Sequence, residues 1–123
     1  PGYGEAYILL SRAYLALDDS GAALETLLDG QRELPDDPDI CELLVRVLRD
    51  AGEDELALEN LDIGLTRNPN HVPLLSLAGL YLFEDGQEED AKNYLARAEA
   101  IAPRDPTLLR SRALIARMLG DEN

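Results

Sequence analysis

Residues able to carry out catalysis or to bind a metal ion are few in this 123-residue chain. His71 is the single histidine and Cys41 the single cysteine, and neither has a base, a nucleophile or a second ligand at a useful spacing. No glycine-rich loop is arranged to hold a phosphate. We therefore expect that the chain is not an enzyme and that it uses no cofactor and no metal. Cys41 is interpreted as a small buried hydrophobe.

The charge balance narrows the classes of partner. Acidic residues number 25 against 11 Lys and Arg, which gives a formal net charge of −14. Nucleic-acid binding needs basic side chains against phosphates, and anionic membranes repel an acidic surface. We therefore expect no nucleic-acid partner and no direct membrane binding. Because 46% of the residues are hydrophobic and interrupt the charge at short intervals, a folded domain is predicted.

Residue types repeat with a period of 34. Prolines, glycines, alanines and leucines share this step, and such self-similarity is typical of a stacked solenoid. The repeating residues are Pro1, Pro35, Pro69 and Pro103; Gly52, Gly86 and Gly120; Ala23, Ala57 and Ala91; and Leu27, Leu61 and Leu95.

Each period reads as two helices. Residues 5–17 carry apolar side chains three and four positions apart, and a second apolar stripe follows over 23–28. In the first period the turn glycine comes late, at Gly21. Asp37 and Asp105 each stand directly before a proline, so both are predicted N-caps with the proline at the first helical position.

The pattern resembles the tetratricopeptide repeat, a helix-turn-helix unit of 34 residues. Its small residues, which let helices approach closely, fall at matching positions in three successive units. They are Ser11, Ala23 and Gly30; Val45, Ala57 and Gly64; and Gly79, Ala91 and Ala98. The resemblance implies an all-α fold, a right-handed α-solenoid of antiparallel helix pairs with about seven helices. Val45 is bulkier than usual, and Cys41 replaces the usual aromatic residue.

The repeats divide the chain into five segments. Residues 1–3 match the end of a preceding repeat, 4–37, 38–71 and 72–105 are three full repeats, and 106–123 are the first helix of a fourth repeat or a capping helix. The cut at both ends favours a fragment of a longer array. A free-standing domain is the alternative, and Arg112 supports it, because it stands where Leu10 and Leu44 occur in earlier repeats.

The resemblance also implies a binding surface. In this family the first helix of each repeat lines a concave groove. The matching central stripe contains five arginines and one glutamate, a net +4, whereas the rest of the chain, with six basic and 24 acidic residues, carries −18. Its candidate partner-binding residues are Arg12, Arg46, Arg49, Leu80, Phe83, Arg110 and Arg117.

A simpler interpretation exists for part of this stripe. Arg46 stands four residues from Glu42 and from Asp50, and Arg49 four from Glu53, so these arginines could form ordinary surface ion pairs. Arg110 and Arg117 have no acidic residue at that spacing. Arginine's planar fork suits carboxylates, so the groove is predicted to bind a partner segment with acidic and apolar residues.

One ligand of the family is argued against. Chaperone-binding members hold the C-terminal carboxylate of heat-shock proteins with lysines and asparagines of the first helices. This chain has instead, at the matching positions, Ile8, Arg12, Leu43, Pro73 and Leu77. We expect it not to bind that tail.

The leading hypothesis is thus a non-catalytic protein–protein interaction scaffold. Family analogy suggests a bacterial envelope, secretion or polysaccharide-export assembly, with the cytoplasmic and periplasmic sides both open. The alternatives are a structural spacer, a regulatory array of a larger enzyme, and an array that self-associates through its open end at Ile115, Met118 and Leu119.

Overall fold

The computed structural model describes residues 2–120, and these form seven α-helices and no strand. The predicted all-α class is confirmed. None of the described helices is long and apolar enough to cross a membrane. Pro1 and residues 121–123, at the outer ends of the first and last expected segments, lie outside the described part. The helices are α1 (Gly2–Ala16), α2 (Ser20–Glu33), α3 (Pro38–Asp50), α4 (Asp54–Arg67), α5 (Val72–Glu84), α6 (Glu88–Ile101) and α7 (Pro106–Gly120).

The helix boundaries follow the 34-residue period. The helices α2, α4 and α6 begin at Ser20, Asp54 and Glu88, and α3, α5 and α7 begin at Pro38, Val72 and Pro106. The chain forms two compact units, one ending at Asn68 and one beginning at Pro69. Each unit has its own packing.

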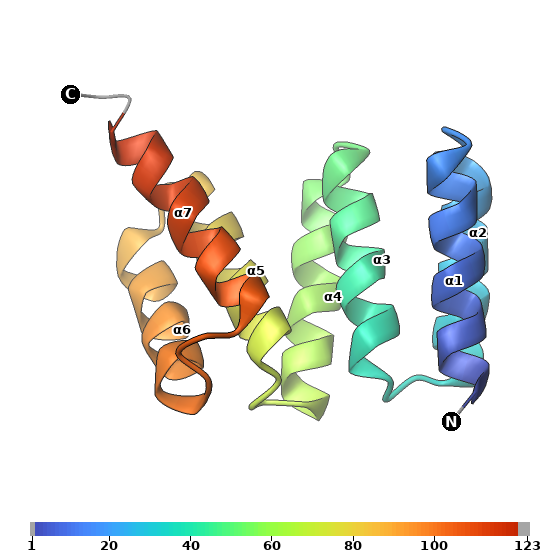
Figure 1. Cartoon of the computed structure of the whole chain (residues 1–123), viewed down its shortest axis with the longest axis horizontal. Helices are drawn as coiled ribbons and strands as arrows, with labels where there is room; N and C mark the ends of the chain where they lie inside the picture. Colours follow the sequence, from blue (N-terminus) through green and yellow to red (C-terminus); the bar gives the residue numbers. More distant parts are fainter. Residues whose placement is uncertain (1, 121–123) are drawn as a thin grey trace. The chain divides into compact units, whose positions relative to one another are not determined.

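In the first unit, α1 packs on α2, α3 packs on α4, and α3 also packs on α1 and α2. Figure 1 shows α1 and α2 as an antiparallel pair joined by a tight turn. Small residues permit the close approach: a Cβ on Gly30 of α2 would lie 2.9 Å from Cγ of Tyr7 on α1. The predicted small positions Ser11, Ala23 and Ala57 are completely buried.

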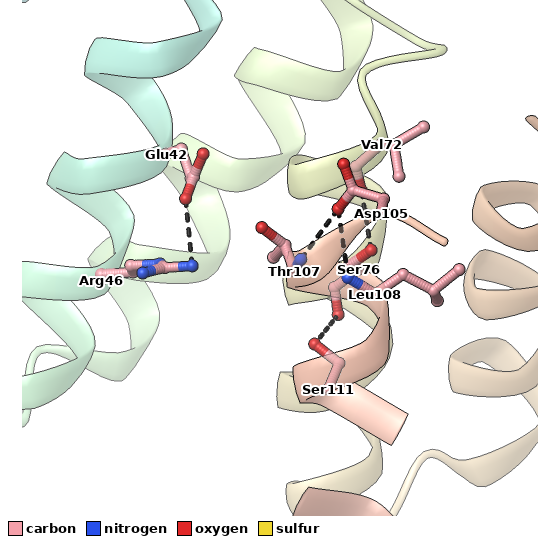
Figure 2. A network of polar contacts seen from close by, with 8 residues as sticks. All are labelled: Glu42, Arg46, Val72, Ser76, Asp105, Thr107, Leu108 and Ser111. Atoms are coloured by element: carbon pink, nitrogen blue, oxygen red, sulfur yellow. Dashed lines mark hydrogen bonds and ion pairs between the residues drawn. The ribbon is translucent and has the colours of Figure 1, made fainter. Parts of the chain in front are cut away.

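In the second unit, α5 packs against both α6 and α7. Gly79 of α5 faces Leu95 of α6 so closely that an added Cβ would lie 2.5 Å from Cγ of Leu95. The hydroxyl of Ser111 on α7 donates to the carbonyl oxygen of Ser76 on α5 at 3.0 Å, and both serines are buried (Figure 2). Arg112, which replaces a packing leucine, instead pairs with Glu99 of α6 at 2.5 Å.

The two predicted aspartate caps are present. Oδ1 of Asp37 accepts from the backbone N–H groups of Asp39 and Ile40, and Pro38 is the first residue of α3. Oδ1 of Asp105 accepts from the N–H groups of Thr107 and Leu108 at the start of α7 (Figure 2). These bonds satisfy backbone donors that have no partner within the helix.

The turn inside each helix pair requires a left-handed backbone. Gly52 and Gly86 adopt φ values of 81° and 85°. The equivalent residue of the first pair is Asp18, with φ 60°, whereas Gly21, the residue expected to serve this turn, lies within α2. The prediction that Gly21 serves this turn is wrong. The turn uses the position 34 residues before Gly52, and the residue there is an aspartate, Asp18. Side chains other than glycine's pay a steric cost in this conformation.

We predict that Asp18→Gly stabilises the protein by about 1 kcal/mol, because glycine adopts positive φ without a steric penalty. The reciprocal change Gly52→Asp should destabilise it by a similar amount. Urea denaturation followed by circular dichroism measures both. Equal stability of Asp18→Gly and the wild type would contradict the prediction.

Candidate protein-binding site

A surface pocket of about 200 Å³ lies between α1 and α3 of the first unit. It contains two of the predicted partner-binding residues, Arg12 and Arg46, which come from the first helices of two successive repeats. The lining residues are Ile8, Arg12, Asp39, Glu42, Leu43 and Arg46. The structure therefore brings Arg12 and Arg46 to one cavity, beside the apolar side chains of Ile8 and Leu43.

Arg46 uses part of its guanidinium group in an ion pair with a neighbouring residue. Its Nη2 lies 3.1 Å from Oε2 of Glu42, so the ion pair expected from their spacing is present (Figure 2). Its Nε atom is buried and has no hydrogen-bond partner among the described residues. Because a guanidinium carries five N–H donors, one ion pair leaves Arg46 with donors for a ligand.

Arg12 and Arg49 differ in availability. Arg12 is exposed and forms no ion pair with any described residue. Arg49 is 13% exposed, and its Nε lies 3.8 Å from Oδ1 of Asp54 at the start of α4. Arg49 therefore links α3 to α4, while Arg12 is available to a ligand.

In the second unit the predicted residues fall on α5 and α7. Leu80 is 7% exposed and belongs to the buried side of α5, and Phe83 is half-buried. Arg110 and Arg117 are exposed on α7, and neither forms an ion pair within residues 2–120. Leu80 thus offers little surface, whereas the two arginines are accessible.

Sequence reasoning did not single out Asp39 as a site residue, and it treated Leu43 only as a departure from the chaperone clamp. Asp39 lies in the first turn of α3, three residues before Glu42 and four before Leu43, so all three share one side of the helix. The helical spacing of Asp39, Glu42 and Leu43 could have indicated that Asp39 and Leu43 also belong to the site. Two arginines face two carboxylates here, so the pocket has mixed charge, in contrast to the positive strip that the stripe alone predicts.

Cys41 lies behind this surface and is 7% exposed. Its Sγ donates to the carbonyl oxygen of Asn60 at 3.4 Å. Burial, aided by the charge of Glu42 and opposed by that of Arg67, raises the pKa of the Cys41 thiol to about 11. The expected burial of Cys41 is confirmed.

The architecture of stacked helix pairs is found in several solved structures. TTC0263 of Thermus thermophilus, a thermophilic TPR protein, is 28% identical, with 95% of this chain and 66% of that chain covered and a TM-score of 0.76. The first TPR of Spaghetti (RPAP3), bound to the HSP90 peptide SRMEEVD, is 14% identical, with 97% and 94% covered and a TM-score of 0.77. The type III secretion translocator chaperone SycD of Yersinia enterocolitica is 15% identical, with 98% and 92% covered and a TM-score of 0.77.

No family model matches the chain, and no curated protein matches its sequence. The structural similarity, together with the 34-residue spacing of the helices, shows that the chain has the fold of tetratricopeptide-repeat proteins. The resemblance inferred from the sequence is confirmed at the level of the fold.

We predict that Cys41 reacts with iodoacetamide at pH 8 far more slowly than a free thiol does. A thiol with pKa about 11 holds very little of the reactive thiolate at that pH. Mass spectrometry of the alkylated protein, native and in urea, measures this. Rapid labelling of the native protein would contradict the prediction.

The raised pKa of Cys41 also makes the stability of the fold depend on pH. Its contribution to stability is fully present below the ordinary pKa of the thiol and is lost as the pH rises towards 11.

Proposed function

We propose that this chain is a non-catalytic module that binds a segment of a partner protein across the first helices of its repeats. The observation that carries the proposal is the pocket between α1 and α3, where two arginines flank the apolar side chains of Ile8 and Leu43. Such a site combines anion recognition with apolar contact. Its size suits a side chain or two of a peptide, in line with the recognition of extended segments by grooves.

The charges of the pocket define the segment. The exposed guanidinium of Arg12 and the unused donors of Arg46 suit a carboxylate, and charge-assisted hydrogen bonds contribute about 1.5–3 kcal/mol each. Asp39 and Glu42 repel further negative charge at the same place. The preferred segment therefore carries single acidic residues separated by apolar ones, without a long acidic run.

The second unit offers contacts of the same kind on its own first helices. Arg110 and Arg117 are exposed and unpaired within residues 2–120, and Phe83 keeps part of its ring accessible. These residues would give further carboxylate and apolar contacts to a partner. Leu80, because it is buried, would act by supporting the surface next to it.

Two of the similar structures support a protein partner. The RPAP3 domain is bound to a peptide, and the Yersinia protein is a secretion chaperone. A place in a bacterial envelope, secretion or polysaccharide-export assembly is proposed on the same analogy.

We predict that Arg12→Glu weakens partner binding about 10- to 100-fold, the effect of losing a charge-assisted hydrogen bond. Because Arg12 is exposed and unpaired within the described chain, its reversal breaks no ion pair of the fold. Arg104→Glu, an equal charge change in the exposed loop before α7, is the matched control. A pull-down from the native lysate identifies the partner, and titration with its labelled segment measures the affinity.

Equal loss of binding in Arg12→Glu and Arg104→Glu would show that only the net charge matters. Unchanged binding in Arg12→Glu would place the site elsewhere. High salt should weaken the wild-type complex, because the contact is largely electrostatic.

We also predict that the peptide SRMEEVD, which the RPAP3 domain binds, does not bind this chain with useful affinity. Where chaperone-binding relatives present lysine and asparagine to the terminal carboxylate, this chain has a single basic side chain, that of Arg12, and the other four positions are hydrophobic residues and a proline. Fluorescence anisotropy with the labelled peptide, using a chaperone-binding domain as the positive control, tests this. Binding below about 10 µM, roughly 7 kcal/mol of affinity, would contradict it.

A further inference from the structure

The charged residues of the pocket between α1 and α3 are ordered along the helices. Asp39 lies in the first turn of α3, Glu42 follows three residues later, and Arg46 follows four residues after Glu42. At 1.5 Å per residue, the backbone positions of Asp39 and Arg46 are about 10 Å apart along the helix axis. On α3 the acidic residues therefore come first and the arginine last.

The helix α1 contributes its own residues in a matching order. The helices α1 and α3 run in the same direction, because α2 reverses the chain between them (Figure 1). The 34-residue period places Ile8 at the height of Glu42, and Arg12 at the height of Arg46. Arg12 is exposed and forms no ion pair with any described residue. The C-terminal end of the pocket is therefore positive.

The charges in the middle of the pocket largely cancel. Oε2 of Glu42 lies 3.1 Å from Nη2 of Arg46, and both side chains are mostly buried (Figure 2). Two arginines and two carboxylates line the pocket, so its net charge is zero within a chain of net charge −14. A ligand thus meets a negative end at the exposed Asp39, a neutral and partly apolar middle, and a positive end at Arg12.

A purely acidic segment matches only one end of such a pocket. A second carboxylate close to Asp39 would be repelled, and a neutral side chain would gain nothing from its charge. An ammonium or guanidinium group at the same place would gain an ion pair. A carboxylate has about four acceptor sites, so Asp39 can bind a cation in addition to other contacts. Complementarity of this kind decides which partner is chosen and in which register it binds.

We propose that the pocket selects a partner segment in which a basic and an acidic residue lie on either side of an apolar one. The inference rests on the proposed function of the pocket and adds the basic residue to the partner. The acidic residue binds Arg12 at the C-terminal end, and the basic residue binds Asp39 at the N-terminal end. The apolar residue between them contacts Ile8 and Leu43.

The length of the pocket sets the spacing of these three residues. In an extended chain alternate side chains point to the same side, and each residue advances the chain by about 3.3 Å. Residues at positions one, three and five therefore share one side and span about 13 Å. The flexible side chains of lysine and glutamate cover the difference from the roughly 10 Å between Asp39 and Arg46. The matching sequence is Lys-x-Leu-x-Glu, with a small polar residue at each x.

Three peptides with blocked ends test this inference. They carry Lys-Ser-Leu-Ser-Glu, Gln-Ser-Leu-Ser-Glu or Glu-Ser-Leu-Ser-Glu between glycines, so they differ only in the first side chain. Titration into the ¹⁵N-labelled chain, followed through the backbone amide signals of Arg12, Leu43 and Arg46, gives the dissociation constants. The lysine peptide should bind about fivefold more tightly than the glutamine peptide, the effect of one exposed ion pair. The glutamate peptide should bind more weakly than both.

Variants of Asp39 identify the group that causes the preference. Asp39→Asn should remove the preference for the lysine peptide and leave the affinity for the glutamine peptide unchanged. Asp39→Lys should reverse the order, so that the glutamate peptide binds best. Asp90→Asn and Asp90→Lys, the same changes in the first turn of α6, are the matched controls for net charge and for the helix dipole. Both controls should leave the order of the peptides unchanged, and circular dichroism confirms that each variant is folded.

The outcomes separate this inference from the proposed function. Equal binding of the lysine and glutamine peptides would overturn the inference, and so would a preference that Asp39→Asn leaves intact. In both cases a loss of binding of all three peptides in Arg12→Glu would still support the proposed function. If no peptide shifts the amide signals of the pocket at about 5 mM, a level that reveals even millimolar binding, both the inference and the pocket as the binding site are overturned.

Discussion

Close contact between helices at small residues is the constraint on which the rest of this structure depends. Gly30 lies against Tyr7, and Gly79 against Leu95, at distances that leave no room for a larger side chain without rearrangement. Because the protein interior is densely packed, such contacts fix both the spacing and the rotation of each helix. Because the small residues recur every 34 positions, the helix boundaries recur with the same spacing.

The same constraint decides which sides of a helix remain for function. In α1 the side with Tyr7 and Ser11 is used for packing, since Tyr7 contacts α2 and Ser11 is fully buried. Another side remains, and it places Ile8 and Arg12 in the pocket. One helix can therefore both pack in the core and line a surface pocket, because its packing uses only part of its circumference.

The charged side chains of the pocket influence which ligand fits, whereas the packing of the helices forms the pocket itself. The pocket pairs two arginines with two carboxylates, and the Glu42–Arg46 ion pair holds one guanidinium in place. Partly exposed ion pairs of this type add little to stability, typically below about 1 kcal/mol. Their effect here is to orient Arg46 and to limit how much negative charge a ligand can bring. Arg12, without such a partner in the described chain, keeps its full capacity for a carboxylate.

The sequence by itself determined the features that depend on neighbours along the chain: the period, the helix pairs, the caps at Asp37 and Asp105, and the small positions such as Ala23 and Ala57. For the candidate arginines, the sequence indicated only that they belong to one stripe of residues. Tertiary structure alone decided that Asp39 joins the pocket and that Leu80 is buried. It also placed Asp18 in the left-handed turn. Caps and periodicity come from hydrogen bonds and spacing within a few residues, whereas exposure depends on which distant helix lies against a side chain.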